Sequence, residues 1–351
     1  MGKVKIIFIT AGIILFGEQS FSQTKMNLDE VIRISLENNQ SVRSSRLNIE
    51  KEKAIDLKSF NIPKPLLFVE YEGVQGSLSN AESRKIGILQ ELEFPTNYFL
   101  RSDVQGSQIK VAGEELNGSI NSLKADIKLN YYNLLLLIEL LKTSKENYKI
   151  YEDFLFTAEK KYEAGESSNL EVLGARVNKV KFENEIKNLE SEIRSLQSEI
   201  KTLMNVGYDI SPAEEFSYTE LMLNKAELLA KAVNNNPELK MLNYQKEKFS
   251  NKISLSKGEL LPDISFKYFK QELLGNNNYW GMEIGLGIPL WFWGEQSGNI
   301  KESNYEYKIA SGEETGFRKS LENEINKSFE EYENSLRQVK FFSDQALKEA
   351  D

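Results

Sequence analysis

The chain has 351 residues, 28% of them charged, and a formal net charge of −9 at pH 7. It contains no cysteine or histidine, so disulfides, thiolate chemistry, an N-terminal lipid anchor and the commonest metal ligand are not expected. An acidic chain without a basic stripe is a poor nucleic-acid binder, and no pattern gathers carboxylates into a catalytic pocket. We therefore expect neither an enzyme nor a cofactor, metal or nucleic-acid complex.

Residues 1–22 read as a secretory signal peptide of the Sec type. Lys3 and Lys5 form a basic segment, residues 6–16 are apolar, and Ser20 and Ser22 flank a bulky residue as small residues do at a cleavage site. A spanning helix needs about 20 apolar residues, so an uncleaved anchor is the less favoured alternative. We expect export, with the mature chain starting at residue 23.

Residues 31–72 and 228–269 follow one plan at an offset of 197 residues, which pairs Asn38 with Asn235, Pro65 with Pro262 and Tyr71 with Tyr268. With one extra residue in the second copy, the register continues from Leu123/Leu321 through Leu141/Val339. Solenoid units are far shorter, at roughly 20–50 residues. The sequence therefore predicts two structural repeats, 23–210 and 211–351, each a helix, a β-hairpin and a long helix.

The hairpins are expected at 66–94 and 263–290, where apolar residues alternate with polar residues or glycine. Segments of about ten such residues are typical of a transmembrane β-barrel, although a half-buried soluble sheet shows the same period. Trp291-Phe292-Trp293 follows where an interfacial aromatic girdle would lie. The apolar, lipid-facing set comprises Ile86, Ile88, Leu92, Phe94, Ile264, Phe266, Tyr268, Trp280, Met282, Ile284, Leu286 and Ile288.

Four strands cannot close a barrel, and lipid does not tolerate open sheet edges. The chain must therefore oligomerise, and three copies would supply twelve strands.

Long helices are expected over 96–161, 167–206 and from about residue 295. The second helix has an unbroken seam of apolar residues at a period of 3.5, which predicts a left-handed coiled coil. Between the first two helices, Gly165 suits a position with positive φ, and Ser167 or Ser168 suits a helix cap. The seam comprises Phe182, Ile186, Leu189, Ile193, Leu196, Ile200 and Leu203.

These features together resemble the TolC family of outer-membrane efflux channels over essentially all of residues 23–351. Lys161–Ser167, running into Leu170-Glu171-Val172-Leu173, resembles the family's helix-hairpin tip. Asn236-Pro237-Glu238-Leu239 resembles the start of its second half. Leu260–Ile264 and Gly287–Trp291 resemble its second β-hairpin, most closely in the heavy-metal (CusC/CzcC-type) branch.

The resemblance implies a mainly α fold with transmembrane β: a homotrimer whose twelve-stranded barrel in the outer membrane continues into a periplasmic helical barrel. It implies a passive exit duct, with heavy-metal cations as one candidate substrate class, that works with a periplasmic adaptor (membrane fusion) protein and an inner-membrane pump of the RND type. Glu171 matches a residue that narrows the pore entrance in some members. The adaptor-binding tip would comprise Tyr162, Gly165, Glu166, Ser167 and Asn169.

Alternatives remain at this stage. The chain has no counterpart of residues 154–208 after Asp351, and we interpret the sequence as a fragment rather than a protein that has lost a helix. An exported coiled-coil periplasmic adaptor without a barrel is the competing class, and a carboxylate-based hydrolase is a distant third. The tip residues could also serve only as helix caps. The sequence does not name the exported substrate.

Overall fold

The computed structural model describes residues 24–216 and 219–343, so the predicted signal peptide at 1–22 lies outside the described residues. The described chain forms two compact units. Unit 1 takes the chain up to Asn39 and from Leu123 to residue 216; unit 2 takes Gln40–Ser122 and the chain from residue 219 onward. The units do not coincide with the two repeats predicted from sequence, because one long helix of the first repeat contributes to both units. The repeats therefore remain a sequence-level prediction.

Unit 1 contains β1 (Thr24–Met26), α1 (Leu28–Asn38), the second part of α3 (Pro95–Glu163), α4 (Asn169–Met204) and β4 (Ile210–Pro212). Asn27 begins α1 with a capping box, in which the Glu30 N–H donates to Asn27 Oδ1 at 2.8 Å and the Asn27 N–H donates to Glu30 Oε2. β1 and β4 pair in parallel. Their pairing fixes the start of the described chain beside the segment that follows α4.

The core of unit 1 gathers where α1, α3 and α4 meet this small sheet. Val31, Ile127, Ile200 and Met204 are among its fully buried residues. The α4 seam predicted from sequence is partly corrected here, because Gln197 and Met204 are buried while Leu196 and Leu203 are only half-buried. An α-helix has 3.6 residues per turn and drifts from a 3.5-residue seam. The buried stripe therefore moves by one residue toward β4.

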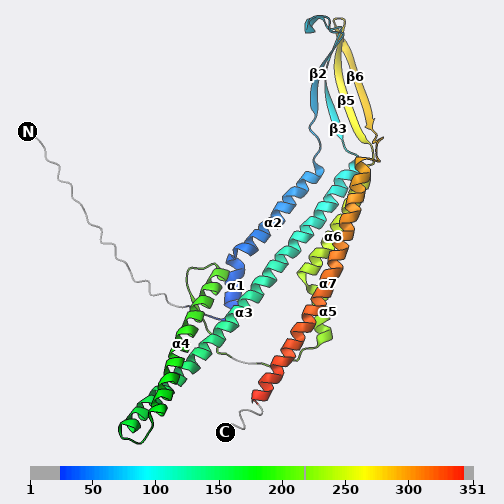
Figure 1. Cartoon of the computed structure of the whole chain (residues 1–351). Coiled ribbons are helices and arrows are strands. Elements are labelled where there is room, and N and C mark those ends of the chain that lie inside the picture. The colour runs from blue at the N-terminus through cyan, green and yellow to red at the C-terminus, as the bar shows by residue number, and fades with distance from the viewer. Residues whose placement is uncertain (1–23, 217–218, 344–351) are drawn as a thin grey trace, which may run out of the picture. The chain divides into compact units, whose positions relative to one another are not determined.

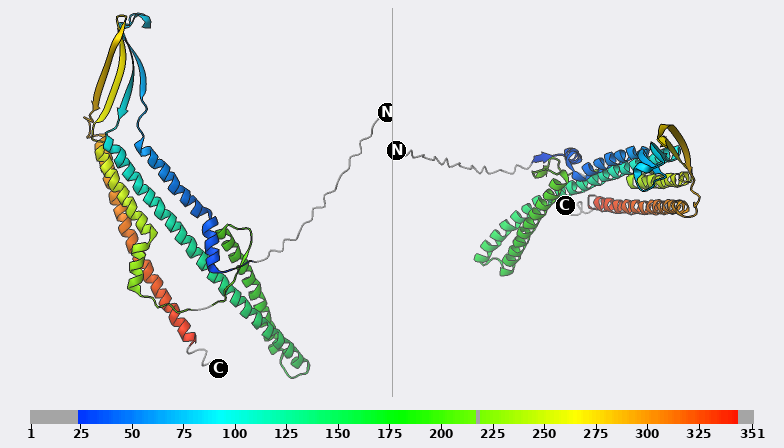
Figure 2. Two further views of the ribbon diagram at one scale, coloured as in Figure 1. Left: turned by 180° about the vertical axis from the view of Figure 1, so that it is seen from behind. Right: turned by 90° about the horizontal axis from the view of Figure 1, so that it is seen from above.

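Unit 2 contains α2 (Gln40–Asp56), η1 (Leu57–Phe60), β2 (Leu66–Glu72), η2 (Leu78–Asn80), β3 (Ser83–Leu92), the first part of α3, α5 (Lys225–Asn235), α6 (Pro237–Gly258), β5 (Asp263–Leu273), β6 (Asn276–Gly287) and α7 (Glu295–Phe341). Within this unit the strands extend beyond one end of the helices, and α6 packs along α7 (Figures 1 and 2). Asn224 caps α5 as Asn27 caps α1, at the sequence offset of the repeat.

The four long strands form one antiparallel sheet in the order β2-β3-β5-β6. The two hairpins therefore join through β3 and β5. Leu274 and Gly275 connect β5 to β6 with φ of 48° and 81°, a turn with two left-handed residues that matches the twist of the strands. Among the residues that the structure describes, no helix carries an apolar run sufficient to cross a membrane.

Candidate functional site: an outward apolar sheet face and a helical tip

The sheet reverses the usual distribution of apolar and polar side chains. Along residues 85–89 of β3 and 265–271 of β5, the odd-numbered positions are half-buried and, apart from Leu89, carry polar, aromatic or glycine residues, whereas the even-numbered positions are exposed and, apart from Lys270, apolar. In β6, Trp280 is 68% exposed and Ile284 is 67% exposed. A soluble sheet buries its apolar face against a core. This sheet has its packed side chains on the polar face instead.

The strand register assigns the faces residue by residue. Ile88 lies opposite Tyr268, Tyr268 opposite Met282, and Ile264 opposite both Leu92 and Leu286. Paired residues in a sheet point to the same side, so ten of the twelve apolar residues named from the sequence share one face. The other two, Phe94 and Ile288, lie just beyond the ends of β3 and β6. Whether this face meets lipid is a matter for the proposal below.

β2 contributes residues that the sequence analysis left out. Its run of four apolar residues obscures the alternation, but pairing with β3 places Leu67, Val69 and Tyr71 on the apolar face. Phe68 falls on the opposite face, where the Lys267 ammonium lies 4.6 Å from its ring centroid. The pairing partner, rather than local sequence, decides the orientation of this strand.

The polar face carries a network centred on Glu70. The Glu70 carboxylate accepts hydrogen bonds from Lys85 Nζ at 3.1 Å and from Lys267 Nζ at 3.3 Å. Lys85 Nζ also donates to Glu72 at 2.7 Å and lies 5.8 Å from the ring centroid of Phe269. The network links β2, β3 and β5, and therefore both hairpins.

Two glycines make room for the aromatic side chains in this network. A Cβ added at Gly87 would meet the rings or stems of Phe68 and Phe269, and one added at Gly281 would meet the ring of Phe269. The rings therefore lie close against the strands. Glycines at the polar-face positions of β3 and β6 are a sequence signal for aromatic rings packed close to these strands. That signal could have predicted the positions of Phe68 and Phe269.

The second predicted site is the turn between α3 and α4. Gly165 has φ of 75°, and the Glu166 N–H donates to Lys161 O at 2.8 Å, which closes the end of α3 as expected. Ser168, rather than Ser167, caps α4 by accepting from the Glu171 N–H. The turn is therefore ordered by local hydrogen bonds.

The structure brings the predicted tip residues together at this turn. Tyr162 is 49% exposed, and Glu166 and Asn169 are also exposed. The hydroxyl of half-buried Ser167 donates to Glu171 Oε2 at 2.6 Å, so the acid named as a pore-entrance residue also takes part in capping. Leu170, which the resemblance placed in the tip but not among its adaptor-binding residues, is 77% exposed.

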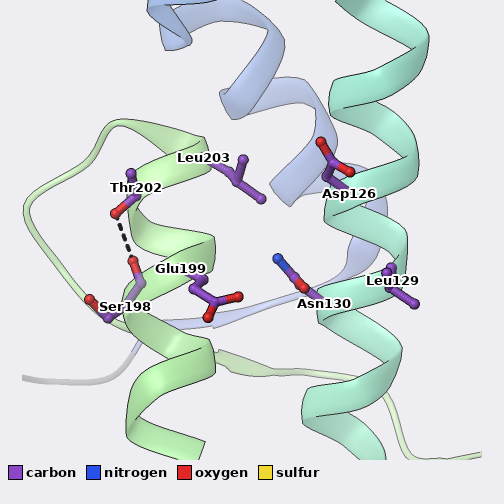
Figure 3. Close-up of a pocket in the computed structure, with 7 residues that line it drawn as sticks. All are labelled: Asp126, Leu129, Asn130, Ser198, Glu199, Thr202 and Leu203. Atoms are coloured by element: carbon purple, nitrogen blue, oxygen red, sulfur yellow. Dashed lines mark hydrogen bonds between the residues drawn. The ribbon is translucent and has the colours of Figure 1, made fainter.

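In unit 1, α3 and α4 form a groove that is lined by polar as well as apolar side chains (Figure 3). Asp126 and Asn130 line it from α3, and Glu199 lines it from α4. Thr202 Oγ1 donates to the Ser198 carbonyl at 2.9 Å, so this hydroxyl is engaged by its own helix. Within the described residues, no group of three or more carboxylates could hold a metal ion.

No protein-family model and no curated protein matches the sequence. Solved structures do match. The outer-membrane channel OprN aligns with a TM-score of 0.75 at 16% identity, over 92% of this chain and 78% of that chain. The Campylobacter jejuni CmeC outer membrane channel aligns with a TM-score of 0.69 at 14% identity, over 99% and 84%. CusC, described in terms of transmembrane channel formation, aligns with a TM-score of 0.68 at 16% identity, over 95% and 80%.

This is the fold of the TolC-type outer-membrane channels. The sequence resemblance is therefore confirmed at the level of fold, and the neighbours are channel proteins rather than enzymes. The similarity to CusC is no greater than that to OprN, so the heavy-metal branch remains a prediction.

Proposed function

We propose that this protein is a subunit of an outer-membrane channel that gives solutes a passive exit from the periplasm. The observation that carries the proposal is the inverted sheet, whose apolar side chains are exposed while its charged side chains are bonded to one another. A lipid-facing wall around an aqueous lumen requires that arrangement. The TolC-type fold supports the same conclusion independently.

The proposal includes a homotrimer. The sheet has four strands, and β2 and β6 each pair on one side only within the described residues. Because unpaired backbone groups are not tolerated in hydrocarbon, three copies closing a twelve-stranded barrel satisfy both edges. The long helices would then surround the periplasmic part of the duct. In this proposal a single chain cannot form the channel, and only the assembled trimer can.

The proposal also names partners. The α3–α4 tip, with Tyr162, Gly165, Glu166, Ser167 and Asn169 near its end, would contact a periplasmic adaptor. Glu171 would line the entrance, and an inner-membrane pump of the RND type would supply the energy. Exposed Leu170 and Tyr162 offer apolar contact area at that tip. Heavy-metal cations are one candidate substrate class.

The test is to fractionate cells that express the full chain and to reconstitute the purified trimer in planar bilayers. We expect recovery in outer membranes, resistance to carbonate extraction and discrete conductance steps. Recovery in the soluble periplasmic fraction would instead favour the exported coiled-coil adaptor. A membrane-bound protein without conductance would support the location and contradict the channel.

A further inference from the structure

The apolar face of the sheet contains a lysine that the other residues of that face do not balance. At the paired strand positions of this face, the polar side chains other than aromatic ones are Arg84, Gln90, Lys270 and Glu272. Glu272 forms an ion pair with Arg84 at 3.1 Å, and Gln90 donates to Pro63 O at 2.8 Å. The exposed Lys270 side chain makes no ion pair or hydrogen bond with the residues that the structure describes. Its ammonium is therefore available to a group outside the chain.

The two cations of this face lie at one end of the sheet. Arg84 is the second residue of β3, and Lys270 lies three residues before the end of β5. Both are thus near the hairpin connections, at the end of the sheet away from the helices (Figure 1). The remaining charge of this face in the described strands, Glu272, lies at the same end. Lysine and arginine on a lipid-facing surface are costly at the bilayer midplane and much less so near its surfaces, so these positions suit the level of the lipid headgroups.

Aromatic side chains mark the same level. Trp280 lies directly opposite Lys270, and Tyr71 lies directly opposite Arg84. The ring of Trp280 is 68% exposed, and its centroid is 6.3 Å from that of Tyr268. Tryptophan and tyrosine are enriched where a membrane meets water. In the proposed channel the helices extend into the periplasm, so this end of the sheet would lie in the outer leaflet.

The strand register brings the two cations within reach of one anion. Arg84 lies opposite Glu272, and Lys270 precedes Glu272 by two residues, so the two cations are diagonal neighbours on the face. Diagonal neighbours are about 7–8 Å apart, a separation that long side chains can bridge. The ion pair with Glu272 leaves further guanidinium donors of Arg84 unused, since arginine has five N–H groups. Arginine and lysine are also the side chains that bind phosphate.

We propose that Arg84 and Lys270 bind a phosphate group of a lipid in the outer leaflet, with Tyr71 and Trp280 against the adjoining parts of that lipid. The inference rests on the proposed outer-membrane location and names a ligand for the apolar face. The lysines of the opposite face do not compete for this role, because Lys85 and Lys267 both donate to Glu70. A trimer would carry three such sites around the barrel.

The test titrates the purified full chain in detergent with fluorescently labelled lipopolysaccharide, a phosphate-bearing lipid. Lys270→Gln removes the unpaired ammonium and leaves the ion pair of Arg84 and Glu272 in place. We expect roughly fivefold weaker binding, the size of effect that one basic residue has at an anionic lipid surface. Lys270→Arg should keep the affinity. The matched control, Lys319→Gln, removes the same charge from an exposed position of α7 and should leave the affinity unchanged.

Two further ligands identify the part of the lipid that is bound. Weaker binding of dephosphorylated lipopolysaccharide, without competition from inorganic phosphate, supports the lipid site. Equal affinity of the unmodified chain and Lys270→Gln, or equal affinity for the dephosphorylated lipid, overturns it. Competition by inorganic phosphate would assign the cations to a free anion and overturn the lipid source. Conductance in phosphatidylcholine bilayers tests the channel separately: a conducting protein without the lipid preference overturns the lipid site alone, and a soluble protein overturns both.

Discussion

The assignment of the apolar sheet face can be tested with one substitution, Ile284→Arg. Ile284 is the third of the five alternating apolar positions that run from Trp280 on β6 to Ile288 just beyond its end, and its side chain is 67% exposed. An arginine near the bilayer midplane costs roughly 2–4 kcal/mol. Three copies would raise the cost to roughly 6–12 kcal/mol per trimer, comparable to the whole stability of many folded domains.

The neighbouring residue supplies the control. Glu283→Arg adds the same side chain to the same strand on the polar face, where it lies opposite Lys267. Like charges directly opposite cost about 0.2–1 kcal/mol, several-fold less than an arginine in lipid. The assay is the amount of heat-resistant trimer in outer membranes. Loss with Ile284→Arg and retention with Glu283→Arg is expected; equal trimer yields would refute the assignment of the faces.

Three further predictions concern positions outside that face. Tyr131 donates to Met26 O, and burial raises its pKa to about 12, so its stabilising effect holds below pH 10 and is lost as pH rises toward 12. Tyr131→Phe should cost about 1 kcal/mol at pH 8, and this cost should shrink and then reverse as pH rises from 10 toward 12, by urea unfolding; a pH-independent difference contradicts this. Glu171→Gln should weaken cation selectivity of single channels while costing only about 0.3–1 kcal/mol; unchanged selectivity would leave Glu171 as a capping residue beside Ser168. Gly275→Ala should lower the trimer's unfolding temperature, because φ of 81° costs a side chain roughly 1–2 kcal/mol; an unchanged temperature would mean that the turn relaxes.

Local periodicity made most of the fold predictable. The helix expected over 96–161 is observed over Pro95–Glu163, and the strands lie where residues alternate. Both signals are local, because a helix or strand repeats its burial pattern every few residues. The break between α1 and α2 was missed. Asn39 departs from helical geometry there and its side chain donates to Leu203 O, a contact with a distant segment.

The site was less predictable where it depends on partners in space. The apolar face followed from alternation alone, but the orientation of β2 required its register with β3. The Glu70 network joins residues almost two hundred positions apart, and no local pattern announces it. Gln197 is buried because its side chain donates to Ile210 O, which a heptad of apolar residues does not reveal.

The Glu70 network bears on the order in which the four-stranded sheet assembles. Every bond in it forms between groups that water solvates before folding, and the network crosses from one hairpin to the other. If the chain is the channel subunit proposed above, its two hairpins can join through their polar face before the apolar face meets lipid. In the proposed twelve-stranded trimer each chain would then contribute a preformed third of the barrel, whose apolar face and two edge strands are covered only on assembly. Covering that exposed apolar face until the barrel closes would then be a requirement of assembly.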